Sequence, residues 1–176
     1  SYSKPVLVHK YGPRRFAVEG SPADCVIAGL NELMPLQPDL VLSGVNKGNN
    51  SAENTLYSGT IGAAMEAALA GIPAIAMSQY YGPENSELED SFEASSAHGV
   101  AAIQACLKAG FARANDYALF YNINFPPVPA IDVLGMKSVA QGYRGDSAFS
   151  ASATTSPNGR KFLFMHGKPQ QVPTKK

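Results

Sequence analysis

Residues 40–78 read LVLSGVNKGNNSAENTLYSGTIGAAMEAALAGIPAIAMS. Two short apolar runs, Leu40–Leu42 and Ala74–Ser78, flank a helical pattern of small residues over Ile61–Ala70, which a glycine and a proline end. Apolar runs of this length are typical of parallel strands that are buried on both faces. The stretch therefore predicts a strand–helix–strand unit, which in a single sheet is nearly always a right-handed crossover.

Helical patterns lie on both sides of this unit. Upstream, Ser21 can cap a helix, Pro22 suits its first position and Asp24 complements the helix dipole, so a helix is expected to run from there to Pro35. Downstream, a longer helix is predicted over residues 91–109. Its expected core side consists of Phe92, Val100, Ile103 and Leu107.

The remainder of the chain has strand patterns. Strands are predicted over Tyr117–Phe125, Leu134–Val139 and Lys161–Met165, and Asn158-Gly159 is typical of a tight hairpin turn. We therefore expect an α/β core built in layers, with a β-hairpin extension over residues 134–170. The length of 176 residues fits a single domain, residues 1–176.

Composition excludes several classes of protein. Hydrophobic residues make up 45% of the chain, which is typical of a globular domain. The 14 Lys and Arg balance the 14 Asp and Glu, so we expect no nucleic-acid duplex as partner. No apolar stretch approaches the roughly 18 residues of a membrane span, so we expect no membrane partner. Cys25 and Cys106 lie in apolar helical patterns and are interpreted as core residues of a cytoplasmic protein.

The loop over Ser43–Asn54 is the first candidate for chemistry. It follows the carboxyl end of a predicted parallel strand, where open α/β sheets bind their ligands. The amide oxygen of Asn46 could bind a hard cation such as Mg²⁺ or Mn²⁺, normally alongside carboxylates. Glu53 is the one carboxylate of the loop, and its side chain can equally face solvent.

The helix start at Ser58-Gly59-Thr60 is the second candidate. It offers hydroxyls and first-turn N–H groups that have no partner within the helix, which makes it suited to phosphate. A cation ligand and a phosphate site on successive loops suggest phosphoryl chemistry. The same residue types are also common in turns and caps, and neither the P-loop nor the dinucleotide fingerprint is present. The residues alone leave both interpretations open.

Five blocks of this sequence resemble the signature blocks of the SurE family, the survival-protein nucleotidases, and they occur in the same order. The resemblance runs from about Phe16 to Met165. The blocks are Gly20-Ser-Pro-Ala-Asp-Cys-Val26, Ser43-Gly-Val-Asn-Lys-Gly-Asn-Asn50, Tyr57-Ser-Gly-Thr-Ile-Gly-Ala-Ala-Met-Glu66, Asn122-Ile-Asn-Phe-Pro126 and Gln141-Gly-Tyr-Arg144.

The resemblance implies a Rossmann-like three-layer core with a parallel-rich sheet, a β-hairpin extension and a homodimer or homotetramer. It implies hydrolysis of nucleoside monophosphates with a divalent metal, Mg²⁺ or Mn²⁺. Asn46 matches the family's metal-binding asparagine. Ser58, Gly59 and Thr60 match the part that contacts the substrate phosphate, and we add Gly44 to these phosphate-binding candidates.

Two adjacent aspartates that bind the metal in the family have no counterpart here, so no catalytic residue is assigned. The family's opening strand and its C-terminal end also have no counterpart, so we expect a domain that is incomplete at both ends. Because the opening strand lies inside the family's sheet, we expect a cleft beside Leu40–Leu42 or a strand from another chain there.

The first hypothesis for function is a metal-dependent phosphomonoesterase that acts on nucleoside 5′- or 3′-monophosphates. The alternative is a nucleotide- or phosphate-binding module without catalysis, and an oligomeric scaffold is a weaker third reading. Tyr80 and Tyr81 could stack on a base or pack under their loop. Arg144 could reach a phosphate or be a solvated loop charge. Asn122 and Asn124 share one side of their strand and receive no role.

Overall fold

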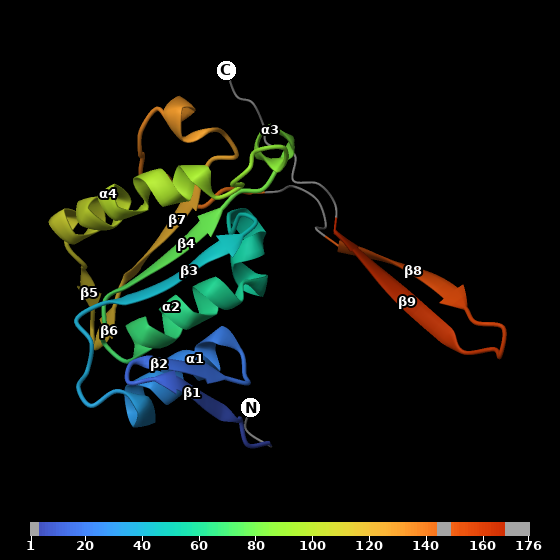
Figure 1. Cartoon of the computed structure of the whole chain (residues 1–176), viewed down its shortest axis with the longest axis horizontal. Helices are drawn as coiled ribbons and strands as arrows, with labels where there is room; N and C mark the ends of the chain where they lie inside the picture. Colours follow the sequence, from blue (N-terminus) through green and yellow to red (C-terminus); the bar gives the residue numbers. More distant parts are fainter. Residues whose placement is uncertain (1–3, 144–148, 168–176) are drawn as a thin grey trace.

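A parallel three-stranded sheet forms the centre of the protein, seen in a computed structural model that describes residues 4–143 and 149–167 (Figure 1). Its strands are β3 (Val41–Lys47), β4 (Ala74–Gln79) and β7 (Phe120–Phe125), in the order β3-β4-β7. All positions of β4 are buried, as its continuous apolar pattern predicts. The α/β layered fold predicted from the sequence is confirmed.

Two helices cover the two faces of the sheet (Figure 1). Helix α2 (Gly59–Leu69) packs on Ala74 and Ala76 of β4, and α4 (Glu93–Ala109) packs on Ile75 and Met77. Successive residues of a strand point to opposite faces, so β4 contributes to both apolar clusters. This arrangement places the start of α2 at the carboxyl end of β3, from which its connecting loop arises.

Helix α4 buries only part of the side that the sequence predicts. The residues that face the sheet are small, namely Ala94, Ser95, Ala102 and Cys106. Val100 is 66% exposed and Leu107 52% exposed, so the prediction that they are core residues is wrong. Ile103 packs against the apolar cluster on this face, as predicted. The small side chains let the helix axis approach the sheet closely, and Val100 and Leu107 then lie outside the contact.

The first helix begins where its capping residues predict. Ser21 and Asp24 form a capping box at the start of α1 (Pro22–Ala28), which continues as a π-helical segment, η1 (Gly29–Leu33). Hydrogen bonds from the Ser21 side chain and backbone lower the pKa of Asp24 to about 2. The contribution of this carboxylate to stability is therefore complete above about pH 4 and is lost as the pH falls through about 2.

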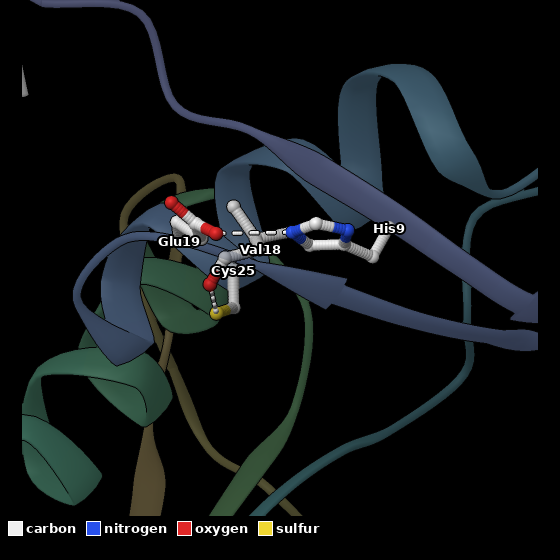
Figure 2. Close-up of polar contacts among 4 residues, drawn as sticks. All are labelled: His9, Val18, Glu19 and Cys25. Carbon is white, nitrogen blue, oxygen red and sulfur yellow. Dashed lines mark hydrogen bonds and ion pairs between the residues drawn. The ribbon is translucent and has the colours of Figure 1, made fainter.

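An N-terminal hairpin precedes α1. It pairs β1 (Val8–Gly12) with β2 (Arg15–Val18), and Figure 2 shows its contacts. His9 Nε2 lies 3.0 Å from Glu19 Oε1, and the Cys25 thiol contacts the Val18 carbonyl at 3.9 Å.

The two cysteines differ in their surroundings. Cys25 is exposed, so the prediction that it is a core residue is wrong, whereas Cys106 is buried and burial raises the pKa of its thiol. Helix α1 presents Cys25 to an open pocket instead of packing it against the sheet.

That pocket lies along β3, which is the edge strand of the sheet in the described residues. Its volume is about 310 Å³, and Leu42 of β3 is 47% exposed. The prediction that Leu40–Leu42 is buried on both faces is therefore wrong, while the expected cleft beside this strand is present. The pocket is lined by Gly20, Pro22, Cys25, Val26, Val41, Leu42, Ser43, Gly44 and Ala63.

A second hairpin, β8 (Phe149–Thr155) with β9 (Lys161–Gly167), extends away from the core (Figure 1). Gly159 has φ +80° in its turn, as the Asn158-Gly159 signal predicts. The predicted strand over Leu134–Val139 is wrong, because no described strand pairs with this segment and Leu134 is fully exposed. Within residues 134–170 the hairpin occupies 149–167, and residues 168–170 lie outside the described part.

Short elements complete the described chain, in which no helix has the length and apolar character needed to cross a membrane. They are η2 (Ala52–Tyr57), α3 (Pro83–Ser86), β5 (Arg113–Ala114), β6 (Tyr117–Ala118) and η3 (Ala130–Asp132). Leu119 separates β6 from β7, so the predicted strand over Tyr117–Phe125 is divided in two.

Candidate functional site

The candidate site lies at the carboxyl edge of the sheet. Strands β3, β4 and β7 run parallel, so they end at the same edge, and the loops that follow them begin there. Asn46 is the penultimate residue of β3 and therefore lies at this edge, as predicted. The loop from Gly48 then leads through η2 to Ser58, where α2 begins.

The amide of Asn46 is oriented by its own loop. Its Nδ2 donates to the carbonyl of Gly48 at 2.8 Å and to that of Lys47 at 3.3 Å. The Gly48 N–H in turn donates to the Gln79 carbonyl at 2.8 Å, which ties the turn to the end of β4. With its nitrogen engaged in this way, Asn46 offers its amide oxygen as the group that can accept a hydrogen bond or bind a cation.

Ser58 caps α2, and its Oγ accepts a hydrogen bond from the Ile61 N–H at 3.1 Å. The N–H groups of Gly59 and Thr60 belong to the same first turn, where helices have no internal acceptor for them. The structure confirms Ser58 as a helix cap, and the role of this helix start toward phosphate stays a prediction. The hydroxyl of Ser58 satisfies one N–H of the turn, and its neighbours keep donors that suit an anion.

Two of the phosphate-binding candidates have packing reasons to be glycine. A Cβ on Gly59 would lie 2.9 Å from Cγ of Pro22, so its absence lets α1 and α2 approach at their starts. Gly44 has φ +124°, and a Cβ there would meet the Met77 carbonyl oxygen at 2.3 Å. Gly44 lies where the pairing of β3 with β4 is irregular, between Ser43 and Asn46, and its role toward phosphate stays a prediction.

Sequence reasoning missed the residue at the centre of the loop, Asn50, which is only 6% exposed. Its backbone N–H donates to Asn124 Oδ1 at 2.7 Å and its side chain donates to Ser78 Oγ at 2.7 Å. Its carbonyl accepts from Asn122 Nδ2 at 2.8 Å and from Asn124 Nδ2 at 3.4 Å. The available signal was the polar residues within two otherwise apolar strands, Ser78 in β4 and Asn122 and Asn124 in β7.

The loop after β4 is also held by a buried amide. Gln79 Nε2 donates to the carbonyls of Tyr80 and Pro126, and Gln79 Oε1 accepts from the Ser95 N–H. Tyr81 beyond it is exposed, and Lys47 Nζ lies 4.1 Å from the centre of its ring. The cation of Lys47 therefore contacts Tyr81 at the carboxyl edge, next to Asn46.

The histidines lie in separate contacts elsewhere. His98 Nε2 lies 2.9 Å from the Ala130 carbonyl oxygen, and His166 Nε2 lies 2.6 Å from Ser152 Oγ on the hairpin. Arg144 is outside the described residues. Across residues 4–143 and 149–167, no three His, Cys, Asp or Glu side chains form a group that could hold a metal ion. Asn46, the predicted metal ligand, therefore has no such group beside it among the described residues.

Comparison with known proteins agrees with the order of the sequence blocks. The family model described as survival protein SurE matches residues 2–148. Proteins named 5'-nucleotidase SurE from Jannaschia sp. and Roseobacter denitrificans are 59% and 58% identical over 99% of this chain. The chain spans 67% of the length of both relatives.

A solved structure supports the same relationship. The crystal structure of the SurE protein from Aquifex aeolicus matches with a TM-score of 0.69 and 30% sequence identity. The match covers 96% of this chain and 64% of that one, so the Aquifex protein is the longer of the two. Its likeness extends over the Rossmann-like core described above. The chain belongs to the SurE family.

Proposed function

We propose that the protein is a phosphohydrolase that releases phosphate from nucleoside 5′- or 3′-monophosphates and requires a divalent metal, Mg²⁺ or Mn²⁺. The observation that carries the proposal is that both candidate groups belong to the same connection of the fold. Asn46 and the Ser58–Thr60 helix start lie on one connection that begins at the carboxyl edge of the sheet. The name 5'-nucleotidase, shared by the similar proteins, supports this substrate class.

The residues of this chain would bind the phosphate and stabilise its charge. The N–H groups of Gly59 and Thr60, with the Thr60 hydroxyl, are suited to phosphoryl oxygens at the positive end of α2. The amide oxygen of Asn46 would be one ligand of the metal. When bound, such a metal polarises the phosphoryl group and lowers the pKa of a bound water. The described residues provide no complete ligand set for such a metal.

Phosphate release by the complete gene product tests this proposal. With AMP or GMP and added Mn²⁺, we expect release that falls to background when a chelator removes the metal and returns when Mn²⁺ is restored. The physical reason is that one amide oxygen and helix N–H groups cannot activate water as a bound metal does. Turnover that persists in the chelator would contradict the proposed mechanism, and phosphate binding without any turnover would favour the non-catalytic module.

We also propose that a second copy of the chain covers the C-terminal hairpin, in a homodimer or homotetramer. Every residue of β8 and β9 is exposed, although an isolated two-stranded hairpin is at best marginally stable in water. The register brings Ala151 opposite Met165 and Ala153 opposite Leu163, which makes one face of the hairpin apolar. At its base Phe149 packs edge-on against Tyr57, beside the start of α2.

Replacing Leu163 and Met165 together by Ser is expected to shift the protein to a smaller oligomer. Burial of such side chains contributes about 1.5–3 kcal/mol each, so dissociation should become easier by about 100-fold or more. Light scattering coupled to size-exclusion chromatography measures the mass. Val100→Ser, at an equally exposed apolar position of α4, is the matched control and should leave the mass unchanged. An unchanged mass for the double variant would remove the hairpin from the interface.

A further inference from the structure

The sheet face that α2 covers is apolar where the strands begin and becomes polar toward their carboxyl edge. The register pairs Ala76 with Asn122 and Ser78 with Asn124, so these side chains lie side by side on neighbouring strands. Ile123, between the two asparagines, instead joins the apolar cluster on the α4 side. Along this face the row on β4 is Ala74, Ala76, Ser78, and the row on β7 is Phe120, Asn122, Asn124.

Asn50 lies on this polar end of the face and is held there from both strands. Ser78 accepts from its side chain, while Asn122 and Asn124 bond its backbone carbonyl and N–H. Asn124 Nδ2 also lies 3.3 Å from Asn122 Oδ1, which orients the two amides relative to each other. Asn50 and Ser78 are buried, and buried polar atoms are costly without partners, so this set of bonds favours one position of the loop.

The position of Asn50 bears directly on the candidate site. Four residues upstream is Asn46, whose amide bonds the Gly48 carbonyl within the same turn. Downstream the chain enters η2 and reaches the Ser58 cap. A loop that is fixed at Asn50 therefore fixes both the candidate cation ligand and the candidate phosphate site. Misplacement by about 1 Å can cost a reaction about 100-fold.

We propose that Ser78, Asn122 and Asn124 are positioning residues, which hold Asn50 and thereby set the geometry of the connection from Asn46 to Ser58. This inference rests on the proposed function for its effect on catalysis. The three side chains act through the loop and need not contact the substrate.

The primary test replaces Asn124 by Leu, which is similar in size and forms no hydrogen bond, in the complete gene product. Amide hydrogen exchange should become faster over residues 48–58, while α2 and α4 keep their protection. With AMP as substrate and Mn²⁺ present, kcat should fall by about 100-fold and KM should change little. Unchanged exchange in the loop, or a raised KM at unchanged kcat, would overturn the proposal.

A conservative variant and a double variant distinguish a positioning role of Asn124 from a general loss of stability. Asn124→Asp keeps an acceptor for the Asn50 N–H and should recover part of the rate that Asn124→Leu loses. If Asn124 acts through the loop, the double variant Asn46→Ala, Asn124→Leu should lose less than the product of the two single losses. A double variant whose rate loss equals the product of the two single losses would contradict the positioning role. Equal rates for the Asn124→Asp and Asn124→Leu variants would also contradict it.

Asn31→Leu is the matched control. Asn31 also donates its side-chain amide to a backbone carbonyl, that of Ile27, and lies in η1, outside the carboxyl edge. In the Asn31→Leu variant, amide hydrogen exchange over residues 48–58 and kcat should equal those of the unchanged protein. If the unchanged protein hydrolyses no nucleotide, the proposed function fails, and the exchange experiment still decides whether these side chains hold the loop.

Discussion

Replacement of Asn46 by Ala is expected to lower nucleotide hydrolysis by the complete gene product by about 100-fold at low metal concentration, at the upper end of the cost of weakening a metal site. The side chain provides the amide oxygen that we propose as a ligand, and its nitrogen bonds the Gly48 carbonyl. Because the loss acts on metal affinity, excess Mn²⁺ should restore part of the rate. Titration of the rate with Mn²⁺ at saturating AMP is the measurement.

Asn46→Asp separates the two contributions of this side chain. Aspartate keeps an oxygen for a cation and loses the donor that bonds the Gly48 carbonyl. If the oxygen is the important atom, the Asp variant should require far less Mn²⁺ than the Ala variant. A defect in Asn46→Ala that no concentration of metal relieves, shared equally by Asn46→Asp, would show that Asn46 shapes the turn and does not bind metal.

Gly44→Ala is expected to destabilise the protein by about 4 kcal/mol, from the strained backbone conformation together with the overpacking of a tight contact. The residue has φ +124°, and the added Cβ would meet the Met77 carbonyl oxygen at 2.3 Å. This oxygen belongs to the backbone of the central strand, so it cannot move aside as a flexible side chain would. A loss of this size is a large part of the usual stability of a domain.

Urea unfolding measures this change, with Gly99→Ala as the matched control. Gly99 lies within α4, and nothing comes within 4 Å of a Cβ built there. Alanine at this helical position should stabilise the protein by about 0.5–1 kcal/mol. A Gly44→Ala variant that unfolds within about 1 kcal/mol of the unchanged protein would refute this explanation of the glycine.

Local patterns in the sequence were sufficient for the central elements. Small residues at helical spacing predicted α2, a continuous apolar run predicted the buried β4, and Asn158-Gly159 predicted the turn of the C-terminal hairpin. Ser21 and Asp24 predicted the start of α1. These features depend on contacts between residues close in sequence, or on burial so complete that the whole element is apolar.

Predictions failed where a residue's surroundings depend on distant segments. The burial of Leu42 depends on whether a strand lies beyond β3, and that of Cys25 on how α1 lies against this edge. Leu134–Val139 has a strand pattern, but a strand also needs a hydrogen-bonding neighbour. In α4, the small residues face the sheet and leave Val100 exposed, which depends on how closely the two elements approach.

The candidate site was likewise predicted only in part from the sequence. The residue types and spacing of Asn46, Ser58, Gly59 and Thr60 identified a loop and a helix start suited to phosphoryl chemistry. The role of Asn122 and Asn124 required the fold, because they lie more than 70 residues from Asn50 in the chain and meet it only through the register of β4 with β7. Short-range patterns specify which groups are present at a site, whereas hydrogen bonds between distant segments fix where those groups are held.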